Sequence, residues 1–407
     1  MQSVCLNFLN GCGNMAADTK GFGPISITVL ADTLTVGGAE QLLLELLRGL
    51  DWERFRVHLC LLDDAPGIVG DEIIALGVAC TRGIARARFD VRAVPRLWRL
   101  FSGQAPDILL LINHRNCLFY GIPAAELARV PWIINWHNET WKTYSLHRLT
   151  MACRRMLLSR IDTAVAAAKG HADYIAATEG VPRNKIEIIY NAVDPEKFHP
   201  ALSREQARAR LGIPCAGPVA GISAALRPDK AHEVFLQAAA IVRIRVPDAR
   251  FLIVGDGPCR AALERRSREL GLESAVHWTG FRRDMPVVLR AMDLFCLSSR
   301  PRQETFSVAA LEAMASGLPV VCTRVGFMHE MVIEGETGFL VPVDDPQALA
   351  AAVTRLLRDP DRCSAMGEHA RALVAGSFSL RHMVASFEKL FLRCAHGRSR
   401  GRRPCAE

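Results

Sequence analysis

The sequence Glu304-Thr-Phe-Ser-Val-Ala-Ala-Leu-Glu312 leads into Met314-Ala-Ser-Gly-Leu-Pro-Val-Val321 and contains two carboxylates eight positions apart. Eight residues make a little over two turns of a helix, so both carboxylates project toward roughly the same side. We expect Glu304 just before the start of a helix and Glu312 inside it. The short apolar run at Val320–Thr323 predicts a buried strand after that helix, which is the pattern of an α/β protein.

Short, continuously apolar runs recur along the chain, and longer segments with helical periodicity separate them. Such runs are typical of parallel sheets that helices cover on both faces. Two series of them predict two doubly wound, Rossmann-like domains of the α/β class. The first series comprises Ile25–Ala31, Val57–Leu62, Asp107–Ile112, Trp132–Trp136, Thr163–Ala167 and Ile186–Tyr190. The second comprises Val219–Ser223, Phe251–Val254, Val276–Thr279, Leu294–Ser298 and Val320–Thr323.

The chain of 407 residues is too long for one ordinary core, which also favours two domains. The boundary is expected in Asn191–Pro200 and the Pro- and Gly-rich Ile213–Pro218, with a helix at Glu205–Leu211 between them. The predicted parts are a loosely ordered extension (1–23), a first domain (24–195), a second domain (196–377), a C-terminal helix with the option of crossing back to the first domain (378–395), and a basic disordered tail (396–407).

The composition is that of a globular protein and not of a nucleic-acid-binding one. Half of the residues are apolar and 23% are charged, which argues against disorder. Lys and Arg number 50 against 42 Asp and Glu, a net charge of +8, but no stripe of basic and aromatic residues accompanies the excess. Part of it lies in His396–Arg403, which we interpret as a solvated end, with weak contact to anionic lipid as the alternative.

The thirteen cysteines are dispersed, with no Cys-x-x-Cys pair, which favours reduced thiols over disulfides or a zinc site. No apolar run reaches 18 residues, and no secretory signal is evident. We therefore expect a cytoplasmic protein. The basic, partly amphipathic segment Lys142–Arg160 adds the option of peripheral contact with the cytoplasmic face of a membrane, and the alternative is a helix packed on the first sheet.

The expected ligand site is the cleft between the two domains, because open parallel sheets bind ligands beyond the carboxyl ends of their strands. A helix start after Glu304 would offer free N–H groups and a positive dipole end to an anion. The flanking carboxylates of Glu304 and Glu312 suit hydroxyl groups. A nucleotide sugar combines a diphosphate with hydroxyls on both sides, and it is the ligand that this pattern favours.

Polar loops follow two strands of the first predicted domain. Asp32–Glu40 includes the adjacent Gly37 and Gly38, which let a backbone approach phosphate or sugar closely, with a simple tight turn as the alternative. His137 follows another strand, and its ring can hydrogen-bond a sugar hydroxyl, although a single His is more often structural. His114 has a similar position in a weaker context.

The second predicted domain has comparable loops. Arg227 and Lys230 follow its first strand and can neutralise a diphosphate without a metal, although two solvated loop charges are the alternative. Trp278–Phe281 is placed to line a base pocket. Gly11–Ala16 has no convincing strand, turn and helix around it. Val254–Pro258 is the end of a strand and a tight turn, but it lacks the Gly-x-Gly-x-x-Gly spacing of a dinucleotide site. A dehydrogenase is therefore disfavoured.

Several motifs occur together in a characteristic order. They are Gly37-Gly38-Ala-Glu40, His137-Asn138, Asn191-Ala-Val-Asp194, Arg227 with Lys230, Val254-Gly-Asp-Gly-Pro258, Glu304 with Glu312, Ser316-Gly-Leu-Pro-Val-Val321, Gly326 with Glu330, and Gly335-Glu-Thr-Gly-Phe-Leu-Val-Pro342. The ordered set resembles glycosyltransferase family 4, retaining enzymes of the GT-B fold. The resemblance spans roughly residues 25–395, and its specificity lies in the order because each motif alone is weak.

The resemblance implies roles for individual residues. In the family pattern the diphosphate is held by cations, the sugar is contacted near the reacting centre, and the second carboxylate takes the ribose hydroxyls. The residues with implied catalytic roles are His137, Arg227, Lys230 and Glu304. Those with implied donor-binding roles are Gly37, Gly38, Gly280, Phe281, Thr305, Phe306, Ser307 and Glu312.

Two positions depart from the family pattern. The family usually has Gly after the first Glu, where this chain has Thr305, and a Cβ there restricts the backbone and can change sugar selectivity. The phosphate-binding Arg of the family commonly precedes the Lys by five residues, where this chain has Ala225. We expect Arg227, three residues before Lys230, to serve instead.

The resemblance implies transfer of a sugar from a nucleotide diphosphate sugar to a hydroxyl of a saccharide or a lipid-linked acceptor, in polysaccharide, lipopolysaccharide or glycolipid assembly. Charges at Arg227, at Lys230 and at the helix start would stabilise the departing diphosphate, so neither a metal nor another cofactor is expected. The alternatives are a nucleotide-sugar epimerase of the same fold and a non-catalytic partner that binds a nucleotide sugar.

Overall fold

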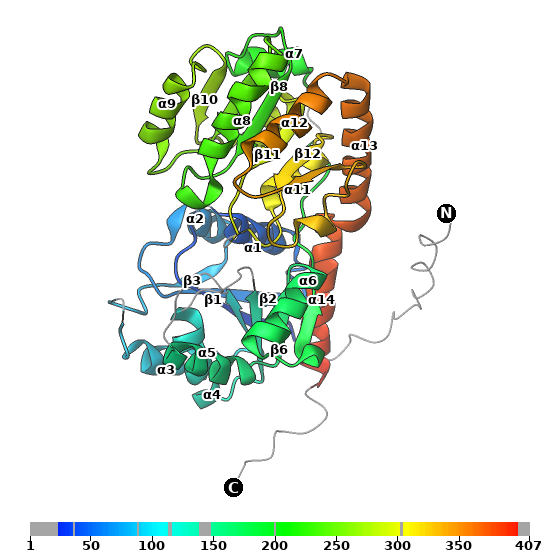
Figure 1. Cartoon of the computed structure of the whole chain (residues 1–407). Helices are drawn as coiled ribbons and strands as arrows, with labels where there is room; N and C mark the ends of the chain where they lie inside the picture. Colours follow the sequence, from blue (N-terminus) through cyan, green and yellow to red (C-terminus); the bar gives the residue numbers. More distant parts are fainter. Residues whose placement is uncertain are drawn as a thin grey trace.

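The computed structural model describes residues 23–35, 37–87, 89–112, 116–137, 148–198, 201–301 and 304–397. Over these residues the chain forms two parallel sheets of seven and six strands, each in its own domain (Figure 1). The predicted α/β class and two doubly wound domains are therefore confirmed. Residues 1–22 of the predicted extension, with Gly11–Ala16, lie outside the described residues, as do His114 and residues 398–407 of the predicted tail.

The N-terminal sheet has the strand order β3-β2-β1-β4-β5-β6-β7, and every neighbouring pair is parallel. Its strands are β1 (Ile25–Ala31), β2 (Phe55–Leu61), β3 (Ala79–Thr81), β4 (Ile108–Ile112), β5 (Trp132–His137), β6 (Thr163–Ala166) and β7 (Ile186–Ile188). Its helices are α1 (Gly38–Gly49), α2 (Gly67–Ala75), α3 (Ala93–Gln104), η1 (Cys117–Gly121), α4 (Ile122–Leu127), α5 (Arg148–Ser159), α6 (Lys169–Tyr174), η3 (Ile175–Glu179) and η4 (Arg183–Lys185).

The C-terminal sheet has the order β10-β9-β8-β11-β12-β13 and is also parallel throughout. Its strands are β8 (Val219–Ser223), β9 (Arg250–Val254), β10 (Val276–Gly280), β11 (Leu294–Leu297), β12 (Val320–Thr323) and β13 (Gly338–Val341). Its helices are α7 (Arg204–Arg210), η5 (Pro228–Lys230), α8 (His232–Arg245), α9 (Arg260–Glu269), α10 (Met285–Arg290), α11 (Val308–Ala315), η6 (Met328–Glu330), α12 (Pro346–Leu357) and α13 (Pro360–Ser377).

All eleven predicted strands are present, and the structure adds the edge strands β3 and β13. The central strands were predictable because they are buried on both faces and therefore continuously apolar. β3 is three residues long and only partly buried, and β13 begins with a glycine, so neither has that pattern. Apolar side chains fill both faces of each sheet, which gives each domain two layers of core.

The last helix, α14 (Leu380–His396), leaves the C-terminal domain and packs on the N-terminal one. In Figure 1 it runs beside the N-terminal sheet. Phe387 lies 4.6 Å from Trp136 of β5, and Phe391 lies 5.8 Å from Phe55 of β2, measured between ring centroids. The chain thus passes between the domains twice.

Candidate active site

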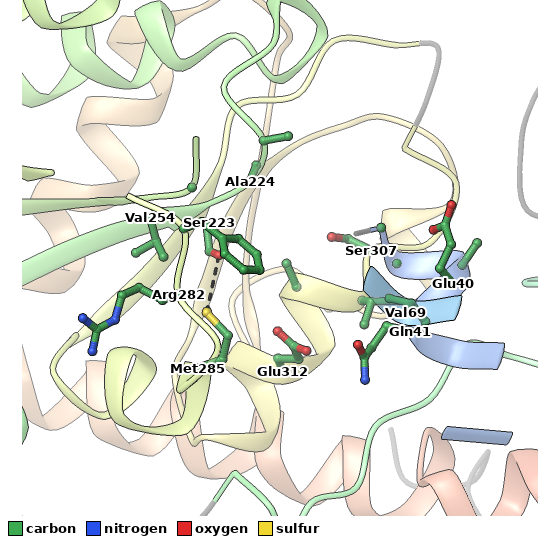
Figure 2. Close-up of a pocket in the computed structure, with 18 of the residues that line it drawn as sticks. Glu40, Gln41, Val69, Ser223, Ala224, Val254, Arg282, Met285, Ser307 and Glu312 are labelled. Carbon is green, nitrogen blue, oxygen red and sulfur yellow. Dashed lines mark hydrogen bonds between the residues drawn. The ribbon is translucent and has the colours of Figure 1, made fainter. Parts of the chain in front are cut away.

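A cleft of about 940 Å³ opens between the carboxyl ends of the two sheets and receives side chains from both domains. This is where open parallel sheets bind ligands. Ten predicted site residues line it: Gly37, Gly38, Arg227, Lys230, Phe281, Glu304, Thr305, Phe306, Ser307 and Glu312. His137 and Gly280 are not among the lining residues. Part of the cleft wall is drawn in Figure 2.

The start of α11 faces this cleft. Ser307 is the N-cap, and its hydroxyl accepts a hydrogen bond of 3.4 Å from the amide of Ala310. Ser is a favoured N-cap because its short side chain satisfies such an amide. Glu304 therefore precedes the helix and Glu312 lies within it, as expected from the spacing. The residues of the first turn that line the cleft are Val308 and Ala309, so the positive end of the helix is directed at a ligand.

Lys230 and Glu304 form the charged floor of the cleft. Lys230 Nζ donates to Glu304 Oε2 at 2.6 Å, and the hydroxyl of Ser299 donates to the same oxygen at 3.0 Å. Burial alone would raise the pKa of Glu304, but the charge and hydrogen bond of Lys230 outweigh it and lower the pKa. Glu304 therefore stays ionised, and Lys230 keeps two further N–H donors for a ligand.

The turn that holds Lys230 is fixed by the neighbouring strand. The hydroxyl of Ser298 donates to the carbonyls of Lys230 and Ala231, at 3.0 and 2.9 Å. Ala231 adopts φ of 46°, a left-handed conformation that few residues other than glycine accept. Arg227, on the same turn, lines the cleft with a half-exposed side chain and contacts Asp229 at 3.3 Å. Two cations thus enter the cleft from one short loop.

Glu312 has a different environment from Glu304. Burial raises its pKa to about 7, while Lys197 acts to lower it and Glu45 to raise it. In Figure 2, Glu312 lies between Met285 of the C-terminal domain and Gln41 of the N-terminal domain. Glu45 is itself the acceptor for Gln41 at 3.1 Å and for Lys197 at 3.0 Å, so the cation that acts on Glu312 is already paired with another carboxylate.

The adjacent glycines of the first domain allow the two walls to meet. Gly37 is the N-cap of α1, and a side chain there would collide with the carboxylate of Glu40. A Cβ on Gly38 would lie 3.2 Å from Val308 at the start of α11. The helix starts of α1 and α11 therefore approach each other across the cleft, with little space for a side chain between them.

His137 lies in a buried polar cluster behind the cleft. It is the last residue of β5 and is fully buried. Its Nε2 lies 2.9 Å from Glu179 Oε2, and its Nδ1 lies 2.6 Å from Asn135 Nδ2. Arg154 also donates to Glu179, at 2.6 Å. Burial would raise the pKa of Glu179, but His137 and Arg154 lower it to about 2. The side chain of His137 is thus engaged on both nitrogens, and its predicted contact with a sugar stays a prediction.

Gly280 and Phe281 end β10 beside the cleft. Gly280 has φ of 68°, and its carbonyl accepts a hydrogen bond of 2.9 Å from the amide of Gly255, so it shapes the turn and does not line the cavity. Phe281 lines the cavity with an exposed ring, available for stacking on a flat ligand group.

Two protein-family profiles match the sequence of this chain. The profile of Glycosyl transferases group 1 matches residues 203–373, and that of Glycosyltransferase Family 4 matches residues 36–197. A 2-deoxystreptamine glucosyltransferase of Streptomyces kanamyceticus is 30% identical over 277 residues, which cover 65% of this chain and 71% of that protein. The chain belongs to the group 1/family 4 glycosyltransferases.

Other similarities agree with this family. The D-inositol 3-phosphate glycosyltransferase of Corynebacterium urealyticum is 37% identical over 232 residues, and the chain spans about half of that relative, 54% of its length. The solved structure of Anabaena HepE with UDP and glucose superimposes with a TM-score of 0.79 at 22% identity, covering 90% of this chain and 99% of that one. At this identity the likeness shows the fold, and the predicted GT-B fold is confirmed.

Several cleft residues of this glycosyltransferase were not singled out from its sequence. Asn191 donates to the carbonyl of Phe306 at 2.7 Å, and its motif was quoted without a role. Arg282 and Arg283 directly follow the predicted Phe281. Their position next to a predicted strand end was the available signal. The other lining residues of this kind are Thr35, Gln41, Lys197, Ser223 and Met285.

Proposed function

We propose that this glycosyltransferase transfers a sugar from a nucleotide diphosphate sugar to a hydroxyl acceptor, with retention of anomeric configuration. The observation that supports this most is the grouping of the Lys230–Glu304 pair, the start of α11 and Glu312 in one interdomain cleft. A cation and a helix start suit a diphosphate, and carboxylates suit hydroxyls. The UDP bound in the HepE structure is consistent with such a donor.

In the proposed reaction the bond between the anomeric carbon and the diphosphate oxygen breaks. The acceptor oxygen bonds to that carbon on the same face, and its proton passes to an oxygen of the leaving diphosphate. Lys230, Arg227 and the start of α11 would stabilise the charge that develops on the diphosphate. No protein base is assigned, because the leaving group itself accepts the proton.

We also propose that the reaction needs no metal ion. Arg227 and Lys230 line the cleft, and their charges would neutralise the diphosphate without a metal. Within the described residues, no group of three or more His, Cys, Asp or Glu side chains forms a candidate metal site. Activity that persists in a strong chelator would support this proposal, and activity that returns only with a divalent cation would contradict it.

The proposed acceptor is a saccharide or a lipid-linked saccharide. One relative, the lipopolysaccharide core biosynthesis mannosyltransferase LpsB of Rhizobium meliloti, is 29% identical over 333 residues, which cover 79% of this chain and 90% of that protein. Its name supports envelope polysaccharide assembly as the setting. An acceptor and donor screen with mass detection would identify the sugar, the base and the acceptor.

Contact with a membrane surface is part of this proposal. No described helix combines the length and apolarity needed to cross a bilayer. Trp98 of α3, Leu127 of α4 and Met156 of α5 are exposed. Arg155 directly precedes Met156 in the sequence of α5, and Arg160 directly follows the end of that helix. An apolar and basic surface suits anionic lipid. Sedimentation with vesicles that contain anionic lipid, and none with neutral vesicles, is the expected result.

Lys230→Met is the variant that tests the donor site. Thermal shift with a panel of nucleotides and nucleotide sugars should show stabilisation of the wild-type chain that the variant loses. Lys389→Met is the matched control, because Lys389 is exposed on α14, outside the cleft. No stabilisation of the wild-type chain by any of these ligands would refute donor binding.

The same assays separate the two alternative functions. A nucleotide-sugar epimerase would convert the donor to an isomer without an acceptor. A non-catalytic partner would bind the donor without turnover. A product whose mass equals acceptor plus sugar minus one water excludes both.

A further inference from the structure

Glu330 joins the two domains behind the cleft. It lies on η6 of the C-terminal domain, and its carboxylate accepts hydrogen bonds from the backbone amides of Lys169 at 3.0 Å and Gly170 at 2.7 Å. These amides open α6 of the N-terminal domain, where the N-cap Ala168 offers no side-chain acceptor. The hydroxyl of Tyr190, in the linker, donates to the same carboxylate at 2.8 Å. One carboxylate thus accepts three hydrogen bonds from outside its own domain.

Aromatic packing surrounds this carboxylate. Phe327 stacks on His171 of α6, with ring centroids 5.5 Å apart and planes 26° apart. A Cβ on Gly170 would lie 2.5 Å from the Phe327 ring, so this position needs glycine for the two domains to meet. Burial and the neighbouring Glu330 raise the pKa of Tyr190, which therefore stays a hydroxyl donor.

The same segment holds the turn of Glu304–Ser307. The amide of Phe327 donates to the carbonyl of Thr305 at 2.9 Å. Gly326 has φ of 49°, and any side chain there would collide with the carbonyl of Glu304. The ring of Tyr190 packs on Phe306 at 5.5 Å. The groups that contact the N-terminal domain are therefore within a few residues of those that support the cleft turn.

We propose that Glu330 is a positioning residue for sugar transfer, which fixes the Glu304–Ser307 turn at its working distance from the N-terminal domain. Through Phe327 and Tyr190 it holds the turn, and through the amides of α6 it holds the opposite wall. It does not line the cleft and has no contact with a ligand in this assignment. This inference depends on the proposed donor site at the turn.

The interdomain contact can be tested without any substrate. In Glu330→Gln the side chain keeps its shape and loses its charge. Its NH₂ group would then face the backbone N–H donors of Lys169 and Gly170. Hydrogen exchange at the amides of Lys169 and Gly170 should become about tenfold faster or more, because a charged hydrogen bond is removed. Glu336→Gln, an exposed acid on the same domain, should leave this exchange unchanged. Unchanged exchange in Glu330→Gln would overturn the proposal at its first step.

The second measurement separates positioning from binding. We expect Glu330→Gln to lower kcat about tenfold or more with a donor and acceptor pair, while the Kd of the free nucleotide changes less than twofold. Gly170→Ala should repeat this pattern by displacing Phe327, and Tyr190→Phe should show a smaller loss. An equal loss of nucleotide affinity and kcat, or faster exchange with unchanged kcat, would refute positioning.

The two assays also distinguish failure of the proposed function from failure of this inference. If the wild-type chain turns over no donor, the proposed function fails, and the exchange result still decides whether Glu330 fastens the domains. If Glu330→Gln does not fold, Tyr190→Phe and Gly170→Ala give the same two readouts. Wild-type exchange and kcat in both of these variants would count against the proposal.

Discussion

Glu312→Gln removes a carboxylate whose ionised form is disfavoured by burial at the cleft. Burial raises the pKa of Glu312 from 4.5 to about 7. The difference of about 2.5 pKa units corresponds to about 3.4 kcal/mol at 1.36 kcal/mol per unit, an upper limit because the side chain is only half-buried. Without a ligand, the protein therefore loses stability whenever this group is forced to ionise.

The sign of the pH dependence follows from the raised pKa. A carboxyl group whose pKa is higher in the folded chain adds stability that is complete below about pH 4.5 and disappears as the pH rises through about 7. Relative to Glu312→Gln, the wild-type chain should lose up to about 2.5 kcal/mol of unfolding free energy between pH 5 and pH 8. Urea unfolding of both proteins at the two pH values measures this difference, with Glu336→Gln as an exposed control.

The affinity for a nucleotide should rise with pH, whereas the free energy of unfolding falls. If ionised Glu312 binds ribose hydroxyls, the affinity of the wild-type chain for a free nucleoside diphosphate should fall by up to about tenfold for each pH unit below 7. The diphosphate protonates in the same range, but it does so equally with Glu312→Gln, so the difference between the two profiles isolates Glu312. Parallel binding profiles, or equal pH dependence of unfolding in the two proteins, would refute the reasoning.

Four further variants test other parts of the site and the fold. Glu304→Gln should lower the transfer rate about tenfold or more while sparing the Kd of the free nucleotide, measured by calorimetry; an equal loss in both would contradict a sugar-binding role. Ala225→Arg restores the cation usual in the family at an exposed position, and it should tighten donor binding severalfold at low salt but not at high salt. Thr305→Gly should broaden the range of donor sugars in a competition assay, and an unchanged ranking would separate Thr305 from selectivity. Asp293→Ala should cost about 3–5 kcal/mol of stability in urea, because it leaves the positive charge of the buried Arg208, now 2.6 Å from that carboxylate, without a carboxylate partner.

The sequence predicted the sheets well because strands buried on both faces have one recognisable composition. The runs at Ile25–Ala31 and Val219–Ser223 match β1 and β8 residue for residue. The start of α11 was also predictable, since an N-cap Ser follows directly on the first carboxylate. Local composition is sufficient for such features, because they depend on neighbours in the sequence.

Features that depend on distant partners could not be predicted in the same way. His137 ends strand β5, and its partners Glu179 and Arg154 come from η3 and α5. The sequence positions of these two residues have no recognisable spacing to His137. The interdomain contacts of Glu330 involve amides about 160 residues away, as the Gly170 contact shows. A sequence motif names such residues, but only the packed domains show what each of them contacts.

The two carboxylates of the opening motif illustrate how the fold gives one residue type two properties. Glu304 is buried and Glu312 is half-buried, and in both cases burial acts to raise the pKa of the carboxyl. Lys230 reverses this effect for Glu304, whereas Lys197, the cation that acts to lower the pKa of Glu312, is itself paired with Glu45. Divergent pKa values in a pair of carboxyls are a physical sign of divided roles. Two hydrogen bonds hold Glu304 and its pKa is lowered, whereas the pKa of Glu312 is raised to about 7. A ligand hydroxyl that binds ionised Glu312 would relieve the cost of its ionisation only in the occupied cleft, so donor binding and the charge of Glu312 should be coupled.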